Sequence, residues 1–100
     1  MARLTIEQKA LIEKIRKQNG KVYNFHKTAE ELQELALVLT QKLLKPTKVP
    51  DQEIIEEIGD VIIRLETLKP YFNQGAILNR INYKLGKYKE YNDHKRYKQI

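Results

Sequence analysis

The chain has 100 residues, a formal net charge of +6 and no cysteine. This length corresponds to one small domain, so residues 1–100 are expected to form a single domain. Without cysteine, disulfide bridges, zinc–thiolate sites and thiol nucleophiles are excluded. No apolar run approaches the roughly 18 residues of a membrane span, and the first ten residues lack the apolar core of a signal peptide. We therefore expect a cytoplasmic protein without a membrane partner.

The first predicted helix spans about residues 6–18. Thr5 and Gln8 have the spacing of a capping box, in which each side chain accepts a hydrogen bond from the backbone N–H of the other residue. Asn19–Gly20 then fits a helix stop. Residues 21–26 are expected to form a connector to the next helix.

The second predicted helix spans about residues 29–44 and carries apolar side chains at helical spacing. Thr28 is expected to be its N-cap, with Glu31 at the third helical position. Two prolines between residues 45 and 50 then interrupt the helical pattern. The apolar stripe of this helix consists of Leu32, Leu35, Ala36, Leu39 and Leu43.

The third predicted helix spans about residues 52–68 and is expected to be capped by Asp51. Gly59 stands in its middle, where glycine costs about 1 kcal/mol relative to alanine, and close packing against another helix would account for it. The fourth predicted helix spans about residues 73–91, and residues 92–100 form a basic tail that is expected to fray. The apolar stripe of the third helix consists of Ile54, Ile58, Val61, Ile62 and Leu65.

The second and third predicted helices are apolar on more than one side. A helix at a protein surface needs only one apolar stripe. These two helices are therefore expected at the centre, touching both the rest of the chain and a second subunit. The sequence predicts an all-α fold, a small antiparallel bundle of about four helices that oligomerises through its central helices.

Charge is distributed unevenly along the chain. Residues 28–68 contain nine of the thirteen acidic residues and four basic ones, a net charge of −5, whereas both flanks are basic. An acidic centre between basic flanks suits a cation site in the middle and an anionic ligand. An ordinary mixed-charge surface is the alternative.

Two pairs of carboxylates are spaced three residues apart, which places the members of each pair on one side of a helix. The pairs are Glu31 with Glu34 and Glu57 with Asp60. Antiparallel packing of their helices would let the pairs face each other, whereas Glu56 is expected to be ordinary surface. Carboxylates at such density repel one another, and a cation between them relieves the repulsion. Oxygen ligands alone favour Mg²⁺ or Mn²⁺.

Ordinary structural roles are the alternative for each pair. Asp60 and Arg64 are four residues apart and could form an ion pair, and Glu31 could serve only as the capping-box partner of Thr28. A di-iron carboxylate site is disfavoured, because it uses a histidine three residues after a glutamate and neither histidine here has that spacing.

The segments EELQE at 30–34 and EEIGD at 56–60 resemble the EExxE…ExxD pattern of the MazG-like all-α nucleoside triphosphate pyrophosphohydrolases. Residues 22–90 as a whole are similar to short phage and prophage members of this family. The resemblance implies a homodimer or homotetramer that uses Mg²⁺ and metal-activated water to cleave a nucleoside triphosphate, (d)NTP, into (d)NMP and pyrophosphate.

The resemblance also implies a role for each matching residue. Glu30 would be a candidate general base or a group that supports the ligands. Tyr83 or Tyr88 could stack on a base, although core packing is the alternative. The implied metal ligands are Glu31, Glu34, Glu57 and Asp60. The implied phosphate-binding residues, which could instead form a solvated basic face, are Arg80, Lys84 and Lys87.

Two other functions stay open from the sequence. The first is nucleic-acid binding, which the net charge and the alternation of tyrosine and lysine in residues 83–98 favour. The acidic centre and the lack of a helix-turn-helix signature oppose it. The second is a catalytically silent helical protein that binds a partner.

Overall fold

The computed structural model describes residues 3–95, with side chains for residues 3–91. These residues form α-helices and one short 3-10 helix, without a strand, which confirms the all-α prediction. Among them, no helix is both long and apolar enough to cross a bilayer. The elements are α1 (Ile6–Asn19), α2 (Lys21–Leu44), α3 (Asp51–Leu68), η1 (Lys69–Tyr71) and α4 (Gln74–Lys95).

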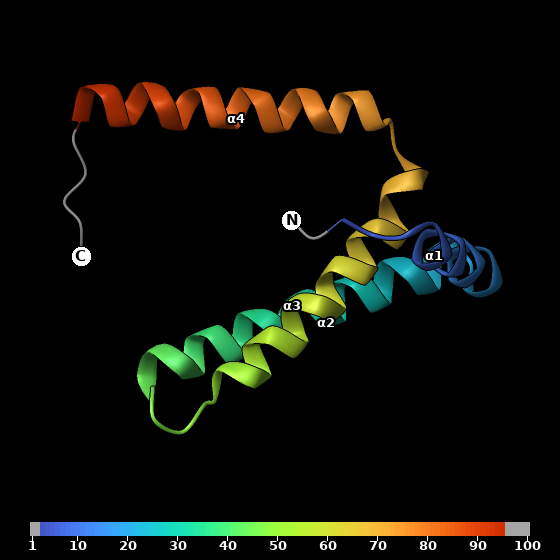
Figure 1. Ribbon diagram of the computed structural model, residues 1–100, viewed down its shortest axis with the longest axis horizontal. Coiled ribbons are helices and arrows are strands. Elements are labelled where there is room, and N and C mark those ends of the chain that lie inside the picture. The colour runs from blue at the N-terminus through green and yellow to red at the C-terminus, as the bar shows by residue number, and fades with distance from the viewer. Residues whose placement is uncertain (1–2, 96–100) are drawn as a thin grey trace. The chain divides into compact units, whose positions relative to one another are not determined.

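The contacts within the chain divide it into two compact units, Met1–Pro70 and Tyr71–Ile100. In the first unit, α2 and α3 run antiparallel as a helical hairpin (Figure 1). Helix α1 contacts both of them. The second unit contains α4. The predicted antiparallel packing of the two central helices is therefore confirmed within the first unit.

The predicted start and end of α1 are confirmed. Thr5 Oγ1 accepts from the Gln8 backbone N–H at 3.0 Å, and Gln8 Oε1 accepts from the Thr5 backbone N–H at 2.8 Å. Gly20 follows with a φ of 82°, in the region that favours glycine. This single residue makes the whole turn from α1 into α2.

The predicted connector at residues 21–26 is wrong, because α2 already begins at Lys21. The turn at Gly20 needs no further residues, and Asn24 secures it by donating from Nδ2 to the backbone oxygen of Arg16 at 3.0 Å. Thr28 is consequently not an N-cap. It lies buried inside α2 and donates to the backbone oxygen of Asn24 at 2.7 Å, the i−4 bond that threonine forms in helix interiors.

The start of α3 also differs from the prediction. Pro50 occupies the N-cap position, no side chain caps the helix, and Asp51 is its first residue. The Asp51 carboxylate instead lies 3.2 Å from Lys42 Nζ. Lys42 also donates to the backbone oxygens of Pro46 at 3.1 Å and Val49 at 2.7 Å, so it joins the end of α2 to the loop that follows it.

The face that α2 turns toward α3 is not its most apolar one. Two predicted stripe residues of α2, Leu39 and Leu43, are 44% and 84% exposed, and Ile58 of α3 is 44% exposed. Of the predicted stripe of α2, Leu35 is half-buried, and so is Glu31, which lies outside the stripe. The interface between the two helices therefore contains a carboxylate, while much of the apolar stripe lies on the outside of this unit.

Helix α4 is present as predicted and begins where expected. Asn73 Oδ1 accepts from the Ala76 backbone N–H at 2.9 Å, which caps its first turn. The helix continues to Lys95, beyond the predicted end near residue 91. The remainder of the tail that was expected to fray, residues 96–100, lies outside the described part of the chain.

Close packing does not account for Gly59, because a Cβ atom built there meets no atom within 4 Å. Gly59→Ala is therefore expected to stabilise the chain by about 1 kcal/mol through helix propensity, which corresponds to a rise in melting temperature of roughly 4–8 °C. Thermal unfolding followed by circular dichroism measures this change. Gly20→Ala is the matched control and should destabilise, because its φ is positive. A lower melting temperature for Gly59→Ala would contradict the prediction.

Candidate metal centre

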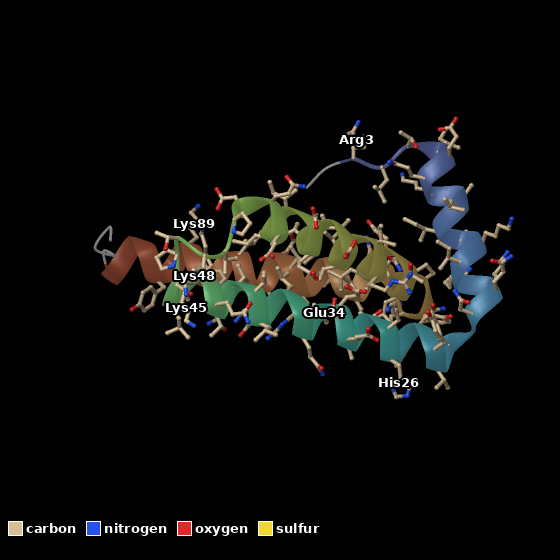
Figure 2. All side chains as sticks on the ribbon, turned by 90° about the horizontal axis from the view of Figure 1, so that it is seen from below. Arg3, His26, Glu34, Lys45, Lys48 and Lys89 are labelled. Atoms are coloured by element: carbon tan, nitrogen blue, oxygen red, sulfur yellow. The ribbon has the colours of Figure 1, made fainter. Side chains whose placement is uncertain are left out.

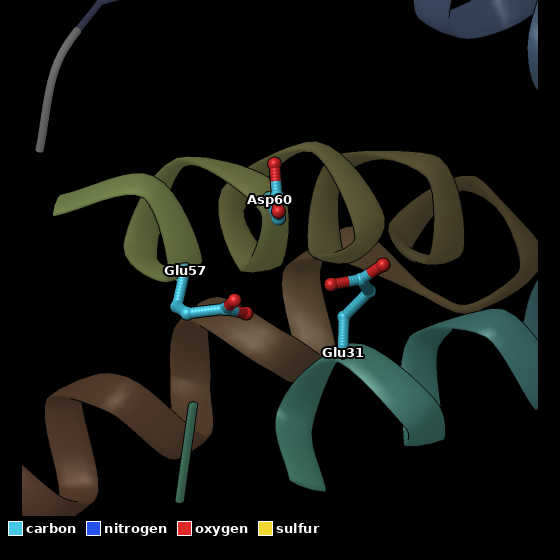
Figure 3. Close-up of side chains that lie close together, drawn as sticks. All are labelled: Glu31, Glu57 and Asp60. Carbon is cyan, nitrogen blue, oxygen red and sulfur yellow. The ribbon is translucent and has the colours of Figure 1, made fainter. Parts of the chain in front are cut away.

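Three carboxylates converge between the helices of the α2–α3 hairpin. Glu31 comes from α2, whereas Glu57 and Asp60 come from consecutive turns of α3 (Figure 3). One carboxylate oxygen from each residue lies within 4.8 Å of the other two. We refer to Glu31, Glu57 and Asp60 as the carboxylate cluster. The prediction that acidic residues of the two helices face each other is confirmed for these three.

The carboxylate cluster is partly shielded from solvent. The Glu31 side chain is only 12% exposed. Its Oε2 atom and the Oε2 atom of Glu57 are buried, and neither has a hydrogen-bond partner in the described chain. A buried carboxylate oxygen without a donor is costly, and a bound cation is one of the few groups that can satisfy it. These two oxygens therefore fit a metal site better than an ordinary acidic surface.

The charges around the cluster also favour a bound cation. Burial raises the pKa of Glu31, and the neighbouring Glu34 and Asp60 raise it further against the lowering effect of Lys27. Burial also raises the pKa of Glu57, with Asp60 and Glu31 adding to the shift. Carboxylates that are desolvated among like charges resist ionisation, and a divalent cation favours their charged forms.

The spacing of the cluster suits a small divalent ion. Magnesium ligands lie about 2.1 Å from the ion, so two ligands on opposite sides of it are about 4.2 Å apart. The carboxylate oxygens of the cluster lie within 4.8 Å of one another, so small side-chain adjustments bring them to that geometry. His26 points away from α3 (Figure 2), and all three ligand candidates are carboxylates, which favours Mg²⁺ or Mn²⁺ over softer metals.

Glu34 is not a member of the group of three, but it lies near enough to Glu31 to raise the pKa of Glu31. It also lines a hollow of about 360 Å³ that continues from Glu57 along the hairpin. Glu56 is exposed, as expected, yet it lines this same hollow. The residues that line the hollow are Glu34, Leu37, Val38, Gln41, Glu53, Glu56 and Glu57.

The sequence analysis did not identify Glu53 as a residue that lines this hollow. The register of the hairpin would have shown it, because residues of α2 and α3 that lie opposite each other have numbers that sum to about 91. Glu31 with Asp60 satisfies this rule, and so does Val38 with Glu53.

Other neighbours of the cluster have structural partners. Glu30 is ion-paired to Lys27 at 3.2 Å, and the same lysine lies 3.6 Å from Glu31. Glu31 cannot be a capping-box partner of Thr28, because both residues lie inside α2. The alternative ion pair between Asp60 and the arginine four residues later is not found within the described residues. The role of Glu30 as a general base stays a prediction.

The predicted phosphate-binding residues Arg80, Lys84 and Lys87 share one exposed face of α4, in the second unit. Arg80 lies 5.1 Å from the ring centroid of Tyr83, and Lys87 lies 5.7 Å from the same ring. Lys84 lies 5.5 Å from the ring centroid of Tyr88. These cation–π contacts keep the cationic and aromatic groups of α4 together.

The raised pKa values predict how the metal-free protein responds to pH. Glu31 and Glu57 take up protons more readily in the folded chain than in the unfolded chain, so their protonated forms stabilise the fold. This stabilisation is fully present below the ordinary pKa of 4.5 and is lost as the pH rises through the raised pKa values. With a chelator present, lowering the pH from 7 toward 5 should raise the melting temperature more in the wild type than in Glu31→Gln/Glu57→Gln. Equal pH responses of the two proteins would contradict this assignment.

No protein-family model, no curated protein and no solved structure matches the chain. Its fold and its site together define a small all-α protein with four helices and an acidic cluster suited to a divalent cation.

Proposed function

We propose that this chain is a Mg²⁺-dependent nucleoside triphosphate pyrophosphohydrolase of the MazG-like kind, which cleaves a (d)NTP into (d)NMP and pyrophosphate. One observation carries the proposal: Glu31, Glu57 and Asp60 converge, with buried oxygens of two of them left without hydrogen-bond donors. These are three of the four positions that the EExxE…ExxD resemblance assigns to metal ligands.

Each acidic residue has a part in the proposed reaction. Glu31, Glu57 and Asp60 hold the ion, and Glu34, whose charge acts on Glu31, is the proposed fourth ligand. A bound Mg²⁺ supplies an acidified water molecule and neutralises charge that develops on the phosphate oxygens. Glu30 is the proposed proton acceptor, and its carboxylate lies 3.2 Å from Lys27 Nζ.

The basic face of α4 is proposed to bind phosphate groups of a nucleotide. Arg80, Lys84 and Lys87 supply three positive charges at successive turns of one helix face. Charges at this spacing suit an extended triphosphate chain better than a single anion. The exposed rings of Tyr83 and Tyr88 on the same helix offer stacking surfaces for a nucleobase.

We also propose that the chain forms a homodimer or homotetramer through α2 and α3. Leu39, Leu43 and Ile58 of their apolar stripes are 44%, 84% and 44% exposed in the first unit. Exposed apolar side chains at helical spacing on two adjacent helices favour a protein partner, and a second copy offers the same surface. Sedimentation equilibrium tests this proposal, and a monomer at all concentrations would contradict it.

The experiment that tests the proposed activity is a measurement of pyrophosphate release from a panel of canonical and modified (d)NTPs. The wild-type chain is expected to release pyrophosphate from at least one of them with Mg²⁺ or Mn²⁺, and release should stop when EDTA removes the metal. Release of inorganic phosphate instead would indicate cleavage at another bond. No release from any nucleotide in the presence of metal would contradict the proposal.

The exposed basic and aromatic face of α4 favours nucleic-acid binding as a second candidate function. Lysine, arginine and tyrosine together bind single strands through phosphate contacts and base stacking. A fluorescently labelled oligonucleotide would then bind in a salt-dependent manner, and Lys84→Gln/Lys87→Gln would weaken the binding. Binding should survive Glu57→Gln, which separates this function from the metal-dependent one.

A further inference from the structure

Arg64 is the only basic residue of α3, and it shares a helix face with the carboxylate cluster. It follows Glu57 by seven residues and Asp60 by four, spacings that return to the same side of an α-helix. Its backbone oxygen lies 3.5 Å from the hydroxyl of Thr28, which precedes Glu31 by three residues on α2. Both helices therefore place Arg64 about one turn, about 5.4 Å, beyond the cluster.

One nitrogen of the Arg64 guanidinium has no hydrogen-bond partner among the described residues. Its Nη1 atom is buried without a hydrogen-bond acceptor, and no ion pair joins the side chain to Asp60 within the described residues. A guanidinium has five N–H donors and stays charged at every physiological pH. Arg64 is half-buried, and a buried N–H donor without an acceptor costs free energy in the folded chain, so the packing around Nη1 does not by itself account for this arginine.

A phosphate group can bind both the guanidinium of Arg64 and an ion held by the carboxylate cluster. The planar fork of a guanidinium matches two phosphate oxygens, and such charged hydrogen bonds are about 2.8 Å long. Ion-to-oxygen distances are about 2.1 Å. One phosphate can therefore touch an ion held by Glu31, Glu57 and Asp60 and also a guanidinium one helical turn away.

We infer that Arg64 is a substrate-binding residue that holds the phosphate chain of a metal–nucleotide complex beside the carboxylate cluster. This inference rests on the proposed function, and it adds an anion-binding group that the resemblance does not assign. Arg64 lies on the same helix as Glu57 and Asp60. Its position relative to the ion is therefore set by α2 and α3 and does not depend on the second unit.

Isothermal titration calorimetry on the full chain tests the inference without catalysis. Mn²⁺ is titrated first, and inorganic pyrophosphate is then titrated in the presence of saturating Mg²⁺. Arg64→Gln should bind Mn²⁺ like the wild type and bind pyrophosphate about tenfold or more weakly, since it loses hydrogen bonds to a charged group. Arg64→Lys keeps the charge without the fork and should lie between the two.

Two comparisons separate ligand binding from structure. Arg3→Gln removes the same charge from an exposed position in the segment before α1 (Figure 2) and should bind pyrophosphate like the wild type. The metal-free melting temperature of Arg64→Gln should stay close to that of the wild type, because Nη1 of Arg64 forms no hydrogen bond within the described residues.

The outcomes distinguish this inference from the proposed function. If the wild type binds Mn²⁺ but Arg64→Gln binds pyrophosphate equally well, the inference about Arg64 is overturned and the metal centre stands. Weaker Mn²⁺ binding by Arg64→Gln would also overturn it, because Arg64 would then be positioning the ligands. If the wild type does not bind Mn²⁺, the proposed function fails and the inference fails with it.

Discussion

Saturating Mn²⁺ is expected to raise the melting temperature of the wild-type chain by roughly 10 °C or more. An ion at one hundred times its dissociation constant stabilises a folded protein by about 2.7 kcal/mol. In a domain of this size each kcal/mol corresponds to about 4–8 °C. The stabilisation should disappear in Glu31→Gln/Glu57→Gln, because the two buried oxygens without donors belong to these residues.

The difference in melting temperature between Glu31→Gln/Glu57→Gln and the wild type should change sign when the metal is removed. Burial and neighbouring carboxylates raise the pKa of both glutamates, so their charged forms destabilise the metal-free fold at pH 7. In a chelator, Glu31→Gln/Glu57→Gln should therefore melt above the wild type, and in Mn²⁺ it should melt below it. Glu7→Gln, at an exposed position of α1, is the control and should follow the wild type in both conditions. Equal responses of all three proteins to Mn²⁺ would remove the cluster from metal binding.

Glu57→Gln and Asp60→Asn are each expected to lower kcat/KM for pyrophosphate release by about a hundredfold or more. Each amide keeps nearly the volume of the carboxylate that it replaces but loses its negative charge. Loss of one group that holds or complements charge in a reaction centre typically has an effect of this size. The measurement is initial-rate kinetics with the best nucleotide of the panel at saturating Mg²⁺.

Glu56→Gln is the matched control for these two variants. It removes the same charge from the same helix, and Glu56 lines the hollow next to Glu57 without belonging to the carboxylate cluster. Its kcat/KM should stay within a fewfold of the wild-type value. A loss as large as that of Glu57→Gln would show that total negative charge matters rather than coordination by particular residues.

The helices could be predicted from the sequence, but the start of α2 could not. Capping signals at Thr5 and the stop at Gly20 act locally, so their effects can be read from neighbouring residues. Thr28 gives the same local signal as an N-cap. In the folded chain its hydroxyl donates to the backbone oxygen of Asn24 inside α2 and lies 3.5 Å from that of Arg64, and the second contact depends on tertiary packing.

The candidate site was predictable in composition and only partly in arrangement. Residue spacing shows that Glu57 and Asp60 share one side of α3, whatever that helix contacts. It does not show which side of α2 turns toward them. The structure turns the side with Glu31 inward and leaves Leu39 44% exposed, which an apolar-stripe argument does not predict. Burial of the carboxylate oxygens, the property that favours a metal, follows from this choice of face.

Direct binding of Mn²⁺ tests the central claim, that Glu31, Glu57 and Asp60 form a divalent-cation site. Electron paramagnetic resonance measures free Mn²⁺ during a titration of the full chain at pH 7. The wild type should bind at least one ion per chain, and Glu31→Gln, Glu57→Gln and Asp60→Asn should each weaken that binding by about tenfold or more. Absence of binding by the wild type, or equal binding by all four proteins, would contradict the claim.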